Sequence, residues 1–225
     1  SGKSSETCFN KKKTKDIVND LGILTPEYID IDIDAVNREY LYELFQKFGS
    51  FVIKPNSSGS SYGVKIVKNI GDIDILVQDL NNNLDIYNNH KNLIIEKYIE
   101  GRELTVAVIE RKNKAFPVEV TEIIAHNNFF DYQSKYTTGF SKHILPANIP
   151  SKIYEKCKDI SKKVHDIIEC KGVSRSDFIL KDQSIYFLEI NSQPGLTEIS
   201  LVPEQLRYQS ISFEELILDI IKSAL

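Results

Sequence analysis

The sequence predicts a globular protein built from helices and hairpin-paired strands, and three stretches carry that prediction. Residues 175–195, RSDFILKDQSIYFLEINSQPG, hold two apolar runs around the polar turn at 181–184, which is typical of a β-hairpin. Residues 51–67, FVIKPNSSGSSYGVKIV, predict two strands joined by a loop of small residues. Apolar residues recur every three or four positions over 36–48 and 153–168, which indicates two amphipathic helices.

Composition limits the class of protein. The chain has 225 residues, 41% hydrophobic and 27% charged, which suits one large domain or two smaller ones. A net charge of −4 gives no support to nucleic-acid binding, which would need a basic stripe. Since no apolar run reaches the roughly 18 residues of a membrane span and no signal peptide opens the sequence, we expect a soluble protein with no membrane partner.

The sulfur-containing residues add two expectations. The three cysteines are odd in number and lack metal-site spacing, which favours a reduced, cytoplasmic protein. The sequence contains no methionine, so we expect a fragment, a processed form or a trimmed form of a longer product.

The remaining elements follow in chain order. Ile17, Val18 and Leu21 predict a helix behind the polar stretch 1–10 and the basic cluster 11–15, and Gly49 is placed to end the helix over 36–48. Ser212 and Glu215 have the spacing of a capping box at the start of the last helix. The other expected elements are an extended piece at 28–33, a helix at 73–80, strands at 93–99, 104–109 and 116–120, and the end of the helix over 153–168 at Gly172.

The hairpin at 175–195 carries the first chemical hypothesis. Glu189 and Asn191 lie two apart, so they project from one face of a strand while Leu188 and Ile190 fill the other. If the hairpin pairs in register, Asp177 joins them. Two carboxylates and an amide oxygen suit a hard cation such as Mg²⁺. The alternative is a solvated hairpin end whose acids happen to cluster.

Two further stretches point to a nucleotide. The loop NSSGSSYG at 56–63 leaves backbone N–H groups uncovered for phosphate oxygens, and Lys54 before it is a positive charge near the same place. It is not a Walker A motif, and an ordinary hairpin turn remains the alternative. The polar bend in IEKYIEGRELTVAVI offers backbone groups to a planar base and Glu103 to a ribose, or is simply a loop.

The long stretch at 126–150 shows neither helical nor strand periodicity, which is typical of a lid or binding loop. Lys135 and Tyr136 are its candidates for chemistry. The four histidines form no zinc or nucleophilic motif, and His165 is expected on the outer face of its helix. A hydrolytic triad is therefore disfavoured.

Read in order, the motifs VIKP, GSSYG, IEKYIEGRE, KY, SRSDF and LEINSQPG closely resemble the ATP-binding and catalytic region of D-alanine:D-alanine ligases, members of the ATP-grasp superfamily. The resemblance implies an α+β, ATP-grasp fold in which two domains, 1–98 and 99–225, hold ATP between antiparallel sheets. It does not cover the family's amino-terminal domain, whose glutamate helps to hold the first D-alanine. Family members are usually dimers through that domain, so we expect a homodimeric parent protein and a monomeric chain here.

The resemblance also implies roles for individual residues. The phosphate contacts match Lys11, Lys54 and Lys135, and the adenine pocket matches Glu96, Lys97 and Ile99, with Glu103 as the acid at the ribose. The ligands of two Mg²⁺ ions, for which Mn²⁺ is an alternative, match Asp177, Glu189 and Asn191. Arg175, Gly195 and Ser200 match the groups around the second D-alanine, and Ser60 and Tyr136 match those that bridge to the absent glutamate. Ser176 and Ile199 depart from the usual pattern, where we expect changes in packing only.

The implied activity is ATP-dependent ligation of two D-alanines through an acyl phosphate, for peptidoglycan precursor synthesis. Tyr136 favours an amine as the second nucleophile, because members that make a depsipeptide tend to have phenylalanine there. Two alternatives stay open: another ATP-grasp ligase of a carboxylate and an amine, and an ATP-binding fragment that is inactive without the amino-terminal domain.

Overall fold

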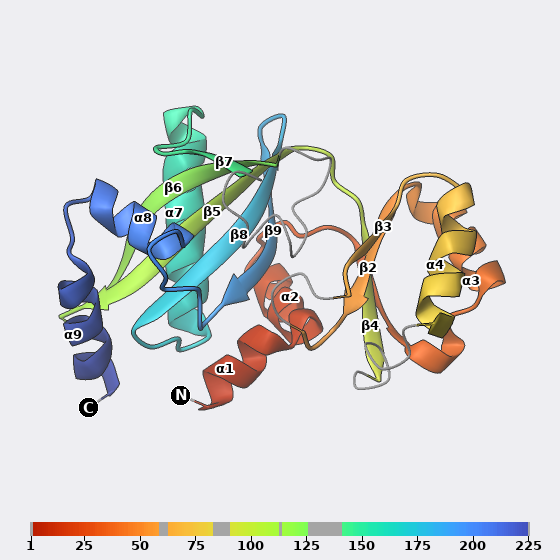
Figure 1. Cartoon of the computed structure of the whole chain (residues 1–225), viewed down its shortest axis with the longest axis horizontal. Coiled ribbons are helices and arrows are strands. Elements are labelled where there is room, and N and C mark those ends of the chain that lie inside the picture. Colours follow the sequence, from red (N-terminus) through yellow and green to blue (C-terminus); the bar gives the residue numbers. More distant parts are fainter. Residues whose placement is uncertain (1, 59–62, 83–90, 113, 126–140, 225) are drawn as a thin grey trace. The chain divides into compact units, whose positions relative to one another are not determined.

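The computed structural model describes residues 2–58, 63–82, 91–112, 114–125 and 141–224, in two compact units (Figure 1). Unit 1 comprises Ser1–Cys8, Lys13–Thr25 and Glu100–Leu225, and unit 2 comprises Phe9–Lys12 and Pro26–Ile99. The chain passes from unit 2 to unit 1 beside the expected boundary at residue 98, whereas most of the first 25 residues group with unit 1. A division into two functional domains stays a prediction.

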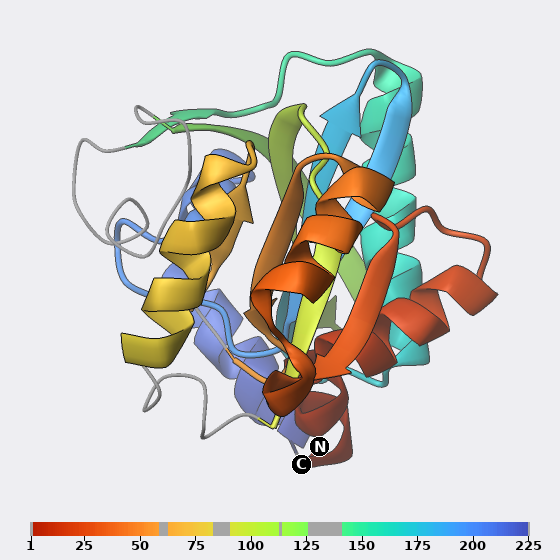
Figure 2. The same ribbon diagram turned by 90° about the vertical axis from the view of Figure 1, so that its right-hand side faces the viewer.

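Unit 2 is built on a four-stranded antiparallel sheet in the order β1-β4-β2-β3. Helices α3 and α4 cover one face of the sheet (Figure 2), where Leu41, Phe48, Leu76 and Ile53 are among the buried core residues. The elements are β1 (Tyr28–Asp32), α3 (Arg38–Phe48), β2 (Phe51–Pro55), β3 (Lys65–Val67), α4 (Gly71–Asn82) and β4 (Asn92–Lys97), with a short 3-10 turn at Ile33–Ala35.

The boundaries of α3 are set by local chemistry. The side chain of Asn37 accepts a hydrogen bond of 3.0 Å from the backbone N–H of Tyr40, which satisfies a free donor at the start of the helix. Gly49 ends the helix with a φ of +68°, in the left-handed region that glycine adopts without strain. The predicted helix end at Gly49 is confirmed.

Unit 1 is built on a five-stranded antiparallel sheet in the order β7-β6-β5-β8-β9. Helix α7 packs on one face, around Val106, Cys157 and Phe178, while α8 and α9 pack on the other, around Ala107 and Leu206. The elements are α1 (Gly2–Phe9) and α2 (Lys11–Asp20), of which Phe9, Lys11 and Lys12 group with unit 2, and β5 (Arg102–Arg111), β6 (Lys114–Ala125), β7 (Ser141–Ile144), α7 (Ser151–Ile167), β8 (Val173–Lys181), β9 (Ser184–Asn191), α8 (Leu201–Tyr208) and α9 (Phe213–Ala224).

Several expectations about unit 1 were wrong. Helices α1 and α8 were not predicted, and α7 ends at Ile167 rather than Gly172. His165 is 1% exposed instead of on an outer face, because the apolar stripe of α7 is wide enough to bury it against Ser174, whose hydroxyl lies 2.7 Å from its Nδ1. The capping box of α9 is confirmed, since Ser212 and Glu215 each bond the other's backbone N–H, at 2.8 and 3.1 Å. Across the residues described, no helix is long and apolar enough to cross a membrane.

Candidate active site

The hairpin at 175–195 pairs in the register that the metal hypothesis requires. Strand β8 runs antiparallel to β9 with Asp177 opposite Glu189 and Arg175 opposite Asn191. Directly opposed residues share a face of the sheet, as do residues two apart on one strand. The structure therefore brings these four side chains together on the face of the sheet that also carries α8 and α9.

A β-bulge makes this arrangement possible. The register shifts between Asp177 and Phe178, so that Phe178 pairs with Phe187, and Leu188 is the extra residue. Phe187 and Ile190 therefore fill the apolar face, whereas Leu188 is only partly buried. The expectation that Leu188 would join Ile190 in the core was wrong, because strict alternation does not survive a bulge.

Asp177 is held by two neighbours. Arg175 donates to it from Nε at 2.9 Å and from Nη2 at 2.7 Å, a two-pronged ion pair, and the hydroxyl of Thr105 donates to Oδ1 at 2.6 Å. Thr105 is opposite Asp177 on the adjoining strand β5 and is fully buried. The carboxylate is thereby fixed in orientation by groups from two strands.

Arg175 is largely buried and lies among carboxylates. Burial lowers the pKa of this guanidinium, but attraction to Asp177, Glu189 and Glu103 outweighs it, so its pKa is raised. Three carboxylates thus act on the Arg175 guanidinium and stabilise its charged form.

The side chains at this hairpin end could supply part of the oxygen ligands that a hard cation needs. Asp177, Glu189 and Asn191 offer only oxygen, which Mg²⁺ prefers, and Mg²⁺ is commonly held by one or two carboxylates plus substrate phosphates. The Asn191 Oδ1 atom accepts a hydrogen bond of 2.9 Å from the backbone N–H of Gln193, which fixes the orientation of the amide. Among the residues that the structure describes, no group of three or more His, Cys, Asp or Glu is placed to bind a metal. A cation held here would therefore need the asparagine and ligand oxygens in addition to the two carboxylates.

A buried glutamine, which sequence reasoning missed, supports the site from behind. Gln205 of α8 is fully buried, accepts from the backbone N–H of Ala107 at 2.9 Å, and donates to the Thr105 carbonyl at 3.2 Å. Between β5 and β6 the register shifts at Val106/Val108, and the Gln205 amide bonds β5 at that irregularity. It also donates to the hydroxyl of Thr121 at 3.0 Å. A helix is thus bonded to the strand that supports Asp177.

Gly195 and Ser200, which the resemblance places around the second D-alanine, lie next to each other. A Cβ built on Gly195 would come within 2.8 Å of the Ser200 Oγ atom, so a side chain there would displace the hydroxyl. The Ser200 hydroxyl is in turn held by Thr197, whose Oγ1 lies at 2.8 Å and whose backbone N–H donates to it at 3.1 Å. Ser200 immediately precedes α8, so the loop at 192–200 carries this pair to the helix that Gln205 anchors.

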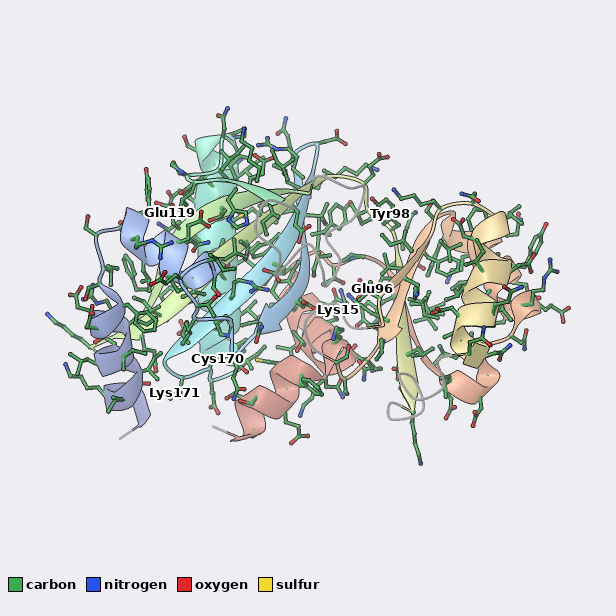
Figure 3. All side chains as sticks on the ribbon, in the orientation of Figure 1. Lys15, Glu96, Tyr98, Glu119, Cys170 and Lys171 are labelled. Carbon is green, nitrogen blue, oxygen red and sulfur yellow. The ribbon has the colours of Figure 1, made fainter. Side chains whose placement is uncertain are left out.

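In unit 2, Lys54 and Glu96 form a buried ion pair. Their Nζ and Oε1 atoms are 3.1 Å apart, with side chains 9% and 3% exposed. They come from adjacent strands β2 and β4 and project from the face opposite α3 and α4, because the core residues Ile53 and Ile95 alternate with them. Figure 3 labels Glu96 on β4. A buried pair of this kind contributes little net stability, so it is better explained by a ligand role or by conformational specificity.

Lys11 is brought to the small-residue loop from a distant part of the chain. It is the first residue of α2, is buried, and donates from Nζ to the carbonyl of Ser58. The backbone N–H groups of Lys11 and Lys12 donate to the carbonyl and side chain of Asn56, at 3.0 and 2.8 Å. Asn56, which sequence reasoning did not single out, thus fixes the start of α2 against the segment after β2.

The structure places three of the remaining residues that were predicted to contact the nucleotide. Lys97 ends β4 with an exposed side chain, and its backbone N–H donates to Glu27 at 2.8 Å. Ile99 follows it, partly exposed, and Glu103 lies on β5 opposite Ile179, in unit 1. Their contacts with a nucleotide stay predictions. Ser60, Lys135 and Tyr136 lie outside the described residues.

Comparison with known proteins identifies the family of this chain. The family model described as "D-ala D-ala ligase C-terminus" matches residues 17–222. The chain belongs to this ligase family. A D-alanine--D-alanine ligase of Zymomonas mobilis is 40% identical over 99% of this chain. The chain spans 67% of the length of that relative and about half of others from Rickettsia, which are 42% identical over 177 residues.

Solved structures agree with this membership. The D-alanine--D-alanine ligase of Bacillus anthracis matches 98% of the chain and 68% of its own length, with a TM-score of 0.78 and 29% identity. The same enzyme complexed with ATP matches with a TM-score of 0.75 and 27% identity, over the same shares of the two chains. The α+β fold with antiparallel sheets is therefore the ATP-grasp fold of D-alanine–D-alanine ligases, as the sequence motifs indicated.

Proposed function

We propose that this chain carries the ATP-binding, metal-binding and second-substrate residues of a D-alanine–D-alanine ligase, which makes the dipeptide for peptidoglycan precursor synthesis. The observation that carries the proposal is the register of β8 and β9, which sets Asp177 opposite Glu189 and Arg175 opposite Asn191 on one face. The family match over 17–222 supports the assignment of substrates. Its site of action is the cytoplasm, where ATP is available and three unlinked cysteines are stable.

In the proposed reaction, the γ-phosphoryl group of ATP passes to the carboxylate of the first D-alanine. The amine of the second D-alanine then attacks the acyl phosphate and releases phosphate. Neither step needs a protein nucleophile, because charge neutralisation and positioning supply most of the catalysis of phosphoryl transfer. Mg²⁺, bound by Asp177, Glu189 and Asn191, would neutralise the charge on the phosphates.

The chain's own residues have two tasks in this scheme. Lys11 and Lys54, with Lys135 by analogy, would meet phosphate oxygens, and the polar loop that begins at Asn56 would add backbone N–H groups. Arg175, with the backbone at Gly195 and the hydroxyl of Ser200, would receive the carboxylate of the second D-alanine. The Arg175 guanidinium has five N–H donors, of which two hydrogen-bond Asp177, so donors remain for a substrate carboxylate.

Titration calorimetry with ATP tests the proposal, first without and then with Mg²⁺. The wild-type chain should bind ATP more tightly when Mg²⁺ is present. Glu189→Gln should bind metal-free ATP as the wild type does. Its increase in ATP affinity on addition of Mg²⁺ should be at least roughly tenfold smaller, because a metal ligand is removed. Asp182→Asn is the matched control, since it removes one negative charge at the exposed turn of the same hairpin.

Two outcomes would contradict the assignment. Equal effects of Glu189→Gln and Asp182→Asn would remove Glu189 from the metal site. Absence of ATP binding by the folded wild-type chain would remove the nucleotide role altogether. A second assay, release of phosphate and formation of D-alanyl-D-alanine on addition of D-alanine, tests the substrate, and D-serine or D-lactate in its place tests the other carboxylate ligases.

A further inference from the structure

Two thiols outside the proposed site lie against each other in unit 1. The Sγ atoms of Cys8 and Cys170 are 3.6 Å apart, although 162 positions separate them in the sequence. The two side chains are 7% and 3% exposed, and Figure 3 labels Cys170 near α1. A disulfide has an S–S distance of about 2.05 Å, so the two atoms would need to approach by only about 1.5 Å.

The backbone on each side allows that approach. Cys8 is the second-last residue of α1, an eight-residue helix, and Cys170 lies in the short link between α7 and β8. Glu169 and Gly172 in that link have φ values of +57° and +72°, so the link is irregular and lies outside the ladder of the sheet. Rotation of the two side chains, with small shifts at these ends of elements, can close the distance without breaking a β-pairing.

The two thiols differ in chemistry. The hydrogen bond from Cys170 lowers the pKa of Cys8, outweighing the effect of burial, and Ser192 adds to the lowering. The same hydrogen bond, together with burial, raises the pKa of Cys170. Cys8 therefore carries more thiolate character, and the thiolate is the form that oxidants attack. Cys157 is different, since burial raises its pKa to about 12.

We propose that Cys8 and Cys170 form a redox-active pair that a hydroperoxide converts into an intramolecular disulfide. The Cys8 thiolate attacks a peroxide oxygen, the O–O bond breaks, and the departing hydroxide takes up the proton that the Cys8 thiol released, which gives Cys8 sulfenic acid and water. The Cys170 sulfur then attacks the Cys8 sulfur, the S–O bond breaks, and hydroxide leaves with the Cys170 proton as a second water. Two thiols are oxidised and one hydrogen peroxide is reduced. A dithiol such as dithiothreitol reduces the disulfide back to two thiols by thiol–disulfide exchange.

The bond would fasten α1 to the link that enters β8. That strand carries Arg175 and Asp177 two and four residues after Val173, and Ser192, which contacts Cys8, directly follows Asn191. The disulfide would thus lie next to two segments of the proposed metal site, the start of β8 and the residue that follows β9. The inference itself stands on the geometry of the thiols and is independent of the proposed function.

Hydrogen peroxide followed by N-ethylmaleimide in denaturant tests the pair, read by intact mass and peptide mapping. The untreated chain has three cysteines and should take three labels. The treated chain should take one label, weigh two hydrogens less, yield a Cys8–Cys170 cross-linked peptide, and regain three labels after dithiothreitol. The single label should sit on Cys157.

Three variants complete the design. Cys157→Ser removes an equally buried thiol and should still form the disulfide, whereas Cys8→Ser and Cys170→Ser should not. The reaction should also be at least ten times slower in urea, because the fold brings the two sulfurs together. Retention of three labels by the treated wild type, a cross-link through Cys157, or linkage between two chains instead of within one would overturn the proposal, and none of these readings depends on a variant that folds.

Discussion

Removal of the Gln205 amide is the sharpest test of how the site is supported. Gln205→Leu keeps the size of the side chain but leaves the backbone N–H of Ala107 and the carbonyl of Thr105 without the partners found at 2.9 and 3.2 Å. A buried polar group that loses its partner costs about 1–3 kcal/mol. For two such backbone groups we expect a loss of about 3–4 kcal/mol.

The loss should be measurable by thermal unfolding followed by circular dichroism. At about 2–4 °C per kcal/mol for a protein of this size, the melting temperature should fall by roughly 10 °C. Hydrogen exchange at the Ala107 amide should accelerate in the same variant, because its acceptor is gone. Gln209→Leu is the matched control: Gln209 lies one turn further along the chain, is exposed, and donates to Glu119 at 2.6 Å. We expect it to cost less than about 1 kcal/mol.

Melting temperatures of both variants close to that of the wild type would refute the reasoning. They would mean that water or a shift of α8 satisfies β5 as well as the glutamine does. A fall in both to the same low value would instead mean that α8 docks through its apolar residues and its whole turn, with no special part for the buried amide.

Three further predictions follow from contacts on the same unit and from the proposed site. Gly101→Ala should destabilise the protein by about 1–3 kcal/mol in urea unfolding, because its Cβ would lie 2.5 Å from the Leu180 carbonyl oxygen, whereas Gly71→Ala, with only an ordinary contact at 3.6 Å, should not. Burial lowers the pKa of His165, so the unfolded chain binds more protons just below pH 6.5 and stability should fall as the pH is lowered from 7 to 5. His165→Gln should flatten that dependence, and an unchanged slope would assign it to other groups. In the proposed ligase, Arg175→Ala should raise the KM for the second D-alanine far more than that for ATP; equal changes would contradict its role.

Local patterns predicted the parts of this protein that depend on local chemistry. The capping box at Ser212, the helix end at Gly49 and the hairpin turn before Ser184 each involve residues within four positions of one another. The cation hypothesis could be stated from one stretch of 21 residues, because Asp177, Glu189 and Asn191 all lie in one hairpin. The turn alone would set Asp177 opposite Leu188, however, and it is the bulge at Leu188 that sets it opposite Glu189.

The supports of the site could not be predicted in this way. Thr105 lies 72 positions before Asp177, and Gln205 lies 98 positions after Ala107, so nothing in either segment signals the contact. A glutamine in an amphipathic helix normally indicates a solvated face, and its burial depends on an irregularity between two strands that are distant in sequence. The bulge at Leu188 was hidden for a related reason, since its apolar side chain suits both faces of an alternating pattern.

The hydrogen bonds of Asp177 restrict how the proposed site can bind a cation. A carboxylate has about four lone-pair positions, two on each oxygen. Arg175 Nε and Thr105 together occupy both on Oδ1, and Arg175 Nη2 occupies one on Oδ2. One position on Oδ2 remains, so Asp177 can serve one cation while its ion pair is intact. Glu189, opposite it, therefore has to provide most of the carboxylate ligation, and for this reason Glu189→Gln is the substitution expected to weaken Mg²⁺-dependent binding most directly.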